Sequence, residues 1–281
     1  MKLEFTKMHG NGNDFIVLKN MDGLLTAEDL SRTARLLCRR KLSLGADGIL
    51  AAEKSDRADF AMRIFNSDGS EAEMCGNGAR VLARYAFDKN IAGKSMSFTT
   101  KAGLIKAVVE PPYAELDMGS FDVTDAALRK FKNFNYIFIT VGVPHCIVFV
   151  DDYDAMSIPD KVDIGRELSR DYERFPQGTN VSFAEIVSGK GCEYDEIKAV
   201  TYERGVEDLT ESCGTGSVAA AIACALLSGE TRATISKRVI NPGGINEVRL
   251  CFEPARSSCH AWLKGKTAIV AQGEISEEAL L

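Results

Sequence analysis

The sequence predicts an α/β protein of the α+β type, built from two similar halves. Three observations favour this fold class. The chain has 281 residues, of which 45% are hydrophobic, enough for one large or two medium cores. The segments CGNGA at Cys75 and CGTGS at Cys213 resemble each other and stand 138 positions apart (213 minus 75), almost half the chain. Each follows a strand-like pattern and precedes a helix-like one.

Three further pairs of segments repeat in the same order along the chain. Glycine-rich turns are common, so each pair alone is a weak signal. The pairs are GNDFIVL at Gly12–Leu18 with GVPHCIVF at Gly142–Phe149, GADGI at Gly45 with GTNVS at Gly178, and FAMRIFNSDG at Phe60–Gly69 with IKAVTYERG at Ile197–Gly205. Four pairs in one order indicate a duplicated unit.

The predicted elements follow the same order in each half: a Gly-Asx loop into a strand, a helix, several strands, and a cysteine that opens a second helix. The second helix of the first half is amphipathic, with an apolar face formed by Val81, Leu82, Tyr85 and Ala86. The corresponding segment after Cys213, SVAAAIACALLSG, is apolar almost all round and should be buried on most sides. Gly229 is its expected C-terminal end, and the two halves should meet near Leu116–Asp122.

Composition excludes several classes of protein. The 34 basic and 40 acidic residues give a net charge of -6, so binding to nucleic acid or to an anionic membrane is not expected. The first residues lack an apolar signal core, and the stretch Ala219–Leu227 is too short to cross a bilayer, so we expect a soluble cytoplasmic protein. Eight cysteines without a secretory signal indicate reduced thiols, and the absence of CxxC argues against zinc.

Each repeated cysteine stands directly before a predicted helix. At that position the helix dipole and the free backbone N–H groups favour thiolate over thiol, so the sulfur can act as a base. The same N–H groups can hold a carboxylate, because glycine lets a ligand approach the backbone closely. The N–H groups in question belong to Gly76, Asn77, Gly214 and Thr215.

A pair of such cysteines suits inversion at an α-carbon. If the halves face each other across a pseudo-twofold axis, Cys75 and Cys213 flank one α-carbon, and one sulfur removes a proton while the other donates one. Without a pyridoxal group, the helix termini in a dry cleft must stabilise the carbanion. A single free cysteine is more often a buried apolar side chain. That is the expectation for Cys38, Cys146, Cys192, Cys224, Cys251 and Cys259.

The segments KMHGNGNDF, FNSDGSEAEMCGNGAR, GTNVSF and YERGVEDLTESCGTGS resemble the diaminopimelate epimerase family over nearly the whole chain. This family interconverts L,L- and meso-diaminopimelate for lysine and peptidoglycan synthesis, without pyridoxal phosphate. The resemblance implies two pseudo-symmetric halves, 1–118 and 119–265, each a curved, mainly antiparallel sheet around a central helix. Residues 266–281 are expected to return to the first half. It further implies a homodimer that needs no cofactor and no metal.

The resemblance also implies a role for each site residue. Cys75 and Cys213 would be the acid/base pair, and Gly76, Asn77, Gly214 and Thr215 would hold the reacting carboxylate. Substrate polar groups would be bound by Asn13, Asn66, Asn180, Glu203 and Arg204, and Arg204 suits bidentate recognition of a carboxylate. His145 and Glu203 would tune the thiol pKa values. Considered without the family, the asparagines could be turn or cap residues, Glu203 and Arg204 a solvated charge pair, and His145 structural.

Two positions depart from the family pattern and leave alternatives open. Many members carry asparagine in place of Val143, and some carry glutamine in place of Gly48. Because Val143 cannot hydrogen-bond a distal carboxylate, a related cofactor-independent racemase with another substrate, such as histidine, is one alternative. A thiol redox protein and a non-catalytic amino-acid binding module are the others. The joint presence of Asn66, Asn180, Glu203 and Arg204 favours the epimerase.

Overall fold

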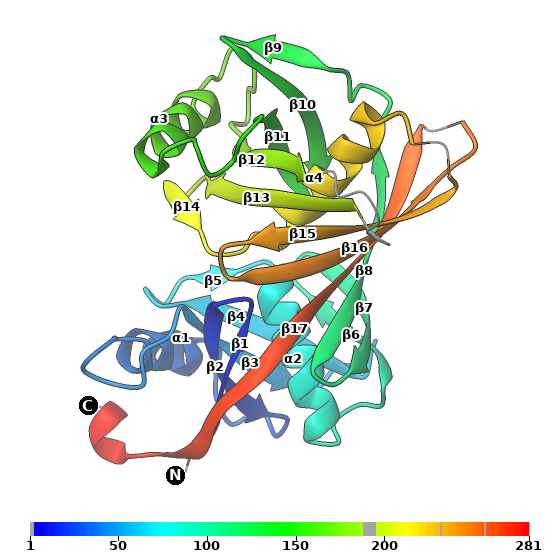
Figure 1. The fold of residues 1–281 in the computed structure, drawn as a ribbon. Helices are drawn as coiled ribbons and strands as arrows, with labels where there is room; N and C mark the ends of the chain where they lie inside the picture. The colour runs from blue at the N-terminus through cyan, green and yellow to red at the C-terminus, as the bar shows by residue number, and fades with distance from the viewer. Residues whose placement is uncertain (1–2, 188–194, 231, 256, 281) are drawn as a thin grey trace. The chain divides into compact units, whose positions relative to one another are not determined.

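The computed structural model describes residues 3–187, 195–230, 232–255 and 257–280 (Figure 1). The chain forms two compact units, Met1–Asp117 with Gly265–Leu281, and Met118–Lys264. It passes from one unit to the other within β8 (Tyr113–Asp122) and again within β17 (Ser258–Ile275). The division into halves at 1–118 and 119–265, with residues 266–281 returning to the first half, stays a prediction. Among the described residues, no helix has the length and apolar character needed to span a membrane.

The first unit is a mainly antiparallel sheet that wraps around one helix. Its strands pair in the order β17, β1, β2, β3, β4, β6, β7, β8; among these pairings of described residues, β2–β3 and β4–β6 are parallel and the others antiparallel. Thr267 donates to the Pro112 carbonyl oxygen from its backbone N at 2.8 Å and from Oγ1 at 2.9 Å. The elements are β1 Leu3–Gly10, β2 Asn13–Asn20, α1 Ala27–Leu37, β3 Gly48–Glu53, β4 Phe60–Asn66, β5 Glu71–Ala72, α2 Gly76–Asp88, β6 Ser95–Thr100, β7 Gly103–Glu110 and the 3-10 helix Glu277–Leu280.

The second unit repeats this plan. Its strands pair in the order β9, β10, β11, β12, β13, β15, β16; where the structure describes these pairings, β11–β12 and β13–β15 are parallel and the others antiparallel. The short β14 pairs with β13, as β5 pairs with β4 in the first unit. The elements are β9 Arg129–Phe131, β10 Phe134–Val141, β11 Val143–Phe149, α3 Ile158–Ser169, β12 Asn180–Val187, β13 Asp195–Glu203, β14 Asp208–Thr210, α4 Gly214–Leu227, β15 Thr234–Asn241 and β16 Gly244–Phe252.

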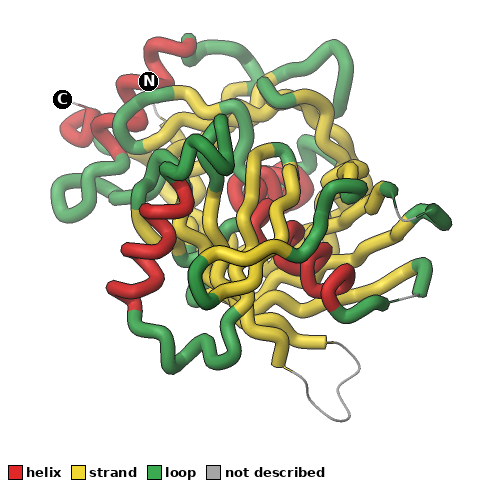
Figure 2. Tube along the Cα trace, turned by 90° about the horizontal axis from the view of Figure 1, so that it is seen from above, coloured by secondary structure: helices red, strands yellow, loops and turns green. Residues whose placement is uncertain are grey.

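The predicted duplication and fold class are confirmed by this correspondence. Helix α2 packs on β1, β2, β3, β4 and β7, and helix α4 packs on the equivalent strands β10, β11, β12, β13 and β16. Helix α1 lies on β3 and β4, and α3 on β12 and β13. Gly45 and Gly178, paired by sequence, both have φ of +67°, a left-handed conformation that glycine adopts at little cost. Strands make up most of the regular structure, with the short helices set among them (Figure 2).

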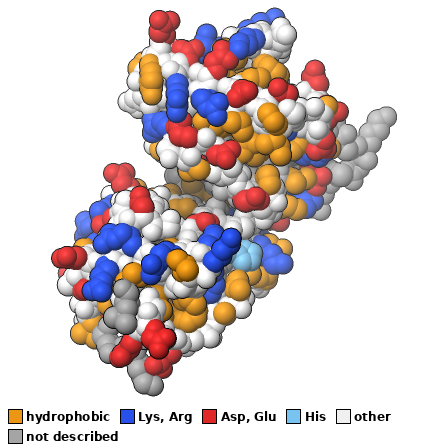
Figure 3. Space-filling view, turned by 90° about the vertical axis from the view of Figure 1, so that its left-hand side faces the viewer, with side chains coloured by type: hydrophobic (Ala, Val, Ile, Leu, Met, Phe, Trp, Pro, Cys, Tyr) orange, Lys and Arg blue, Asp and Glu red, His pale blue; other side chains and the backbone are white. Residues whose placement is uncertain are grey.

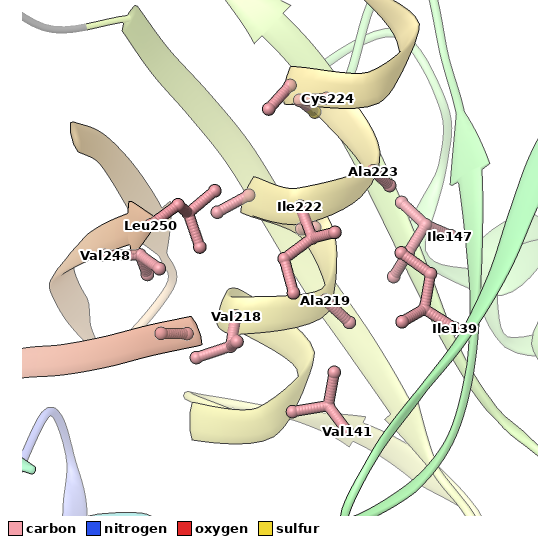
Figure 4. Packing of buried hydrophobic residues seen from close by; sticks show 14 of the residues in the cluster. Ile139, Val141, Ile147, Val218, Ala219, Ile222, Ala223, Cys224, Val248 and Leu250 are labelled. Carbon is pink, nitrogen blue, oxygen red and sulfur yellow. The ribbon is translucent and has the colours of Figure 1, made fainter. Parts of the chain in front are cut away.

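The central helices are buried as the sequence predicted. Val81, Leu82, Tyr85 and Ala86 of α2 are all buried, and α4 is buried almost all round. Figure 4 shows Ile222 of α4 among the side chains of its cluster, including those of β10, β11 and β16. Helix α4 ends at Leu227 and is followed by Gly229 with φ of +62°.

Charged side chains of both signs alternate over the face drawn in Figure 3. The described chain also carries many ion pairs between its basic and acidic residues, such as Arg63 with Glu71 at 2.8 Å. This surface agrees with the nearly balanced count of charges in the sequence.

Candidate active site

Both repeated cysteines occupy the N-cap position of a central helix. Cys75 caps α2, and its Sγ accepts a hydrogen bond from the Gly78 backbone N at 3.5 Å. Cys213 caps α4, and its Sγ accepts from the Gly216 backbone N at 3.4 Å. The prediction that each cysteine immediately precedes a helix is confirmed. In each unit, the sulfur therefore lies beside backbone N–H groups that have no partner within the helix.

Two asparagines gather at Cys75. Asn13, the first residue of β2, has its Oδ1 3.5 Å from the Cys75 Sγ, and Asn77 of α2 donates from Nδ2 to the same oxygen at 3.4 Å. Asn13 Nδ2 in turn donates to Asp47 Oδ2 at 2.7 Å, which fixes which end of the Asn13 amide faces the sulfur. Asp47 follows Gly45 in the GADG loop, and its role as the anchor of Asn13 was not anticipated from the sequence.

Cys213 is surrounded by a different set of groups. Thr215 Oγ1 lies 3.5 Å from the Cys213 Sγ and 3.0 Å from His145 Nε2. Glu203, at the end of β13, is hydrogen-bonded to Cys213 and accepts from Thr210 Oγ1 at 2.6 Å. The two residues expected to tune the thiols, His145 and Glu203, thus both lie at Cys213.

The expectation that both cysteines favour the thiolate is wrong for Cys213. Burial raises the pKa of this thiol, and the neighbouring Glu203 carboxyl raises it further. Hydrogen bonds from Thr215 and Gly216 act in the opposite direction but do not outweigh these effects. The helix N-terminus is therefore insufficient to favour the thiolate of Cys213, because desolvation penalises the charged sulfur. Burial also raises the pKa of Glu203, which hydrogen bonds from Thr210 and Cys213 lower in part.

Burial lowers the pKa of His145 to about 3, so the folded protein holds this imidazole neutral. Its unfolded value is near 6.5. Between pH 3 and pH 6.5 the unfolded chain binds a proton at His145 that the folded protein does not bind. The contribution of His145 to the free energy of unfolding is therefore fully present above pH 6.5 and is lost as the pH falls toward 3. We expect the free energy of unfolding to fall less steeply over this range in His145→Asn than in the wild type, measured by urea denaturation. Equal slopes would contradict a neutral, buried His145.

The remaining predicted substrate residues lie at strand ends. Asn180 opens β12 beside His145 of β11, and its Oδ1 accepts from the Arg204 backbone N at 2.9 Å. Arg204 Nη1 donates to the Gln177 carbonyl oxygen. In the described part of the chain no ion pair joins Arg204 to Glu203, so these two are not a solvated charge pair. Asn66 is exposed at the end of β4 and donates from Nδ2 to Ser70 Oγ at 3.0 Å.

The two departures from the family pattern differ in their structural consequence. A Cβ added at Gly48 would lie 2.5 Å from the Phe65 carbonyl oxygen of the paired strand β4, so no side chain fits without a backbone shift. Val143 opens β11 and is 36% exposed. The backbone thus explains the glycine, whereas Val143 presents a partly exposed apolar side chain at the start of its strand.

Gly216 holds the Cys213 sulfur at close range. A Cβ here would lie 2.6 Å from Thr201 Oγ1 and 3.2 Å from the Cys213 Sγ, whereas a Cβ at the equivalent Gly78 first meets the Leu50 side chain at 3.1 Å. We expect Gly216→Ala to displace the sulfur and lower kcat by roughly 10- to 100-fold, because small misplacements of catalytic groups are costly. Gly78→Ala is the matched control. Equal kcat values in the two variants would show that this packing is irrelevant to catalysis.

Several polar residues at the start of α4 were missed by the sequence reasoning. Ser217 Oγ donates to the Cys213 carbonyl oxygen at 2.9 Å, and Asn246 Nδ2 donates to Ser217 Oγ at 2.9 Å. Asn241 Nδ2 donates to the same hydroxyl at 3.2 Å. All three side chains are buried. The sequence signal that could have revealed them is the presence of asparagines in two segments whose alternating apolar residues predict strands. No group of His, Cys, Asp and Glu residues suited to a metal ion occurs within the described ranges.

The fold occurs in solved structures of low sequence identity. A *Bacillus anthracis* phenazine biosynthesis protein of the PhzF family aligns with a TM-score of 0.72 at 14% identity, covering 98% of this chain and 99% of its own. A hydroxyproline epimerase from *Agrobacterium vitis*, with bound trans-4-hydroxy-L-proline, aligns with a TM-score of 0.66 at 17% identity, covering 98% and 93%. The protein therefore belongs to a class with a duplicated α/β fold, in which each of the two central helices begins at a cysteine.

Sequence comparison identifies the family within this class. The family model described as diaminopimelate epimerase matches residues 5–124 and 137–259. Diaminopimelate epimerase of *Archaeoglobus fulgidus* is 39% identical, covering 91% of this chain and 92% of its own, and that of *Methanocella arvoryzae* is 38% identical, covering 98% and 97%. The enzyme of *Aquifex aeolicus* is 34% identical over 99% of both chains. The chain belongs to the diaminopimelate epimerase family.

Proposed function

We propose that this protein epimerises L,L-diaminopimelate to meso-diaminopimelate by a two-base mechanism, as a step toward lysine and peptidoglycan precursors. The observation that carries the proposal is the matched pair of N-cap cysteines, one on each central helix, in a chain of this family. One sulfur removes the α-hydrogen and the other protonates the opposite face of the carbon, so the configuration inverts without an oxidant or a carbonyl cofactor.

The helix N-termini supply the electrostatic part of the mechanism. The backbone N–H groups of Gly76 and Asn77, and of Gly214 and Thr215, belong to the first turns of α2 and α4. They hold the reacting carboxylate and stabilise the negative charge that develops on it as the α-proton leaves. No pyridoxal group and no metal has a place in this scheme.

The other predicted residues bind the polar groups of the substrate. The contacts of Asn13 with Cys75, and of Asn180 with Arg204, support substrate-binding roles for both asparagines. The Arg204 guanidinium takes the distal carboxylate, and Asn66 contributes from the end of β4. His145 and Glu203 act on Cys213, because one reaches it through Thr215 and the other bonds to it.

Two further properties belong to the proposal. The protein acts in the cytoplasm, which suits a mechanism that needs reduced thiols. It forms a homodimer, as the family resemblance implies. Analytical ultracentrifugation tests for the homodimer. A monomer at working concentrations would reject the homodimer without affecting the proposed chemistry.

The experiment that tests the proposed function uses pure protein under reducing conditions without pyridoxal phosphate. L,L-Diaminopimelate, histidine and a panel of other amino acids are incubated in parallel, and the stereoisomers are separated by chiral chromatography. We expect meso-diaminopimelate to form and the other amino acids to keep their configuration. Inversion of histidine or another amino acid alone would reassign the substrate and make Val143 the first position to examine. Binding without inversion of any compound would favour the binding-module alternative.

A further inference from the structure

His145 of β11 is a buried imidazole with one ring nitrogen left unpaired. The residue is 0% exposed. Its Nε2 lies 3.0 Å from Thr215 Oγ1, whereas its Nδ1 is buried and has no hydrogen-bond partner within the described part of the chain. A protonated imidazole carries an N–H donor on both nitrogens, and a neutral one carries one donor and one acceptor. The surroundings therefore suit the neutral ring, which leaves two tautomers to distinguish.

The unpaired nitrogen distinguishes the two tautomers of His145. If the proton were on Nδ1, a buried N–H donor would have no acceptor, and such orphaned donors are rare in folded proteins. If the proton is on Nε2, the unpaired nitrogen is an acceptor only, and the N–H group points to the Thr215 oxygen. The arrangement without an orphaned donor is the one in which His145 donates and Thr215 accepts.

The hydrogen bonds on the other side of Thr215 indicate the same direction. Cys213 is hydrogen-bonded to the Glu203 carboxyl, which also accepts from Thr210 Oγ1 at 2.6 Å. An ionised carboxyl has no proton to donate, so the Cys213 thiol supplies the proton of this hydrogen bond. The sulfur then has no second proton for Thr215, whose Oγ1 lies 3.5 Å away. Thr215 is therefore the donor in its contact with the Cys213 sulfur.

The Thr215 hydroxyl can serve both contacts at once. A hydroxyl has one proton to donate and two lone pairs with which to accept. Because the His145 Nε2 donates to its oxygen, the single proton of this hydroxyl is directed to the sulfur. The Gly216 backbone N donates to the same sulfur at 3.4 Å. The Cys213 sulfur therefore faces two donors on the side away from its own proton.

The first unit carries other residues at the equivalent positions. In the repeated segments, Phe15 of β2 corresponds to His145, and Phe15 is buried with no polar group in its side chain. Asn77 of α2 corresponds to Thr215 of α4. The pairing of an imidazole with a hydroxyl therefore belongs to the second unit and was not copied in both halves.

We propose that His145, neutral and protonated at Nε2, is a positioning residue that fixes the Thr215 hydroxyl as a hydrogen-bond donor to the Cys213 sulfur. When Cys213 gives its proton to the α-carbon, the negative charge left on the sulfur meets a hydroxyl already turned toward it. The Thr215 proton stays on its own oxygen throughout. The role in turnover rests on the proposed function, whereas the direction of the hydrogen bonds can be measured without substrate.

The first experiment determines the tautomer of His145 in the wild-type protein. The chain has three histidines, His9, His145 and His260, so protein labelled with ¹⁵N-histidine gives few signals, and His145→Asn identifies those of His145. Long-range proton–nitrogen correlation spectra at about pH 8, where ordinary histidines are neutral, show which ring nitrogen carries the proton. We expect the proton of His145 on Nε2. A proton on Nδ1, or on both nitrogens, overturns the proposal.

The second experiment removes the hydroxyl. Thr215→Val has nearly the same shape and keeps the backbone N–H, so kcat should fall by roughly 10- to 100-fold with little change in KM, as expected when a hydrogen bond to a charged group is lost. Thr215→Ser keeps the hydroxyl and should restore most of kcat. Thr124→Val is the control and should leave kcat unchanged, because the Thr124 hydroxyl is exposed and donates to the Ser257 carbonyl oxygen.

Spectra of the same variants separate a directed hydrogen bond from a general structural role. In folded Thr215→Val the Nε2 signals of His145 should shift, because this N–H loses its acceptor. In Thr215→Ser and Thr124→Val they should stay close to their wild-type positions. Unchanged His145 signals in folded Thr215→Val, or a kcat close to that of the wild type, overturn the proposal. If this variant does not fold, the tautomer in the wild-type protein still decides.

Failure of this inference is distinguishable from failure of the proposed function. A proton on Nε2 of His145 that responds to Thr215→Val, in a protein that does not epimerise diaminopimelate, would retain the hydrogen bonds and reject the activity. Epimerisation by a protein whose His145 carries its proton on Nδ1 would retain the activity and reject the positioning role of His145.

Discussion

Cys75→Ala and Cys213→Ala are each expected to lower kcat for diaminopimelate epimerisation by roughly 100- to 10,000-fold or more. This is the range for removing a general acid or base, and the mechanism has no second group to replace either sulfur. The helix starts should survive, because a single weak cap of 3.4 to 3.5 Å is lost in each case. Circular dichroism and initial-rate measurements on the same preparations check both parts of this prediction.

Cys251→Ala is the matched control, since Cys251 is a half-buried thiol of β16 that belongs to no part of the proposed site. It should keep wild-type kcat within about twofold. Undiminished activity in either Cys75→Ala or Cys213→Ala would reject two-base chemistry. Loss of activity in Cys251→Ala with the fold intact would show that the assay responds to any thiol, and the first result would then carry no weight.

Arg204→Met is expected to raise KM for diaminopimelate by roughly 10- to 100-fold while changing kcat much less. A hydrogen bond to a charged group contributes about 1.5 to 3 kcal/mol, and the distal carboxylate is held alike before and during the reaction. The KM of Arg204→Lys should lie between those of Arg204→Met and the wild type, because lysine keeps the charge but not the bidentate geometry. Steady-state kinetics with both stereoisomers gives the values.

Arg170→Met serves as the comparison for Arg204→Met. Arg170 is an exposed arginine of the same unit that pairs with Glu207. The Arg170→Met substitution should leave KM unchanged. If Arg204→Met lowers kcat and leaves KM alone, Arg204 acts in the transition state and the distal carboxylate is held elsewhere. If neither constant changes, Arg204 has no part in substrate recognition.

Local patterns were sufficient to predict the duplicated fold and the start of each central helix. The repeat placed Cys75 and Cys213 at equivalent positions, and the glycines that follow them favoured a helix start. The apolar periodicity of Val81 to Ala86 predicted the buried face of α2 correctly. Each of these features can be recognised in short segments of the chain, or by comparing such segments, which is why a single sequence could reveal them.

Protonation states could not be predicted in the same way. The groups that raise the pKa of Cys213 act through burial by several strands and through Glu203 of a separate strand. The helix N-terminus is a local feature and predicted a thiolate at Cys213, whereas desolvation and the carboxyl of a separate strand favour the thiol there. Cys192, expected to be a packing residue, lies outside the described residues.

In the proposed reaction, two different sulfurs remove and donate a proton on opposite faces of one carbon. The most direct test follows the first turnovers of L,L-diaminopimelate in deuterated buffer and measures deuterium in both the remaining substrate and the product. Two monoprotic bases predict meso product with one deuterium at the inverted carbon and remaining substrate without deuterium. Product that retains the original hydrogen, or deuterium that enters the substrate as fast as product forms, would indicate a single base and contradict the two-base mechanism.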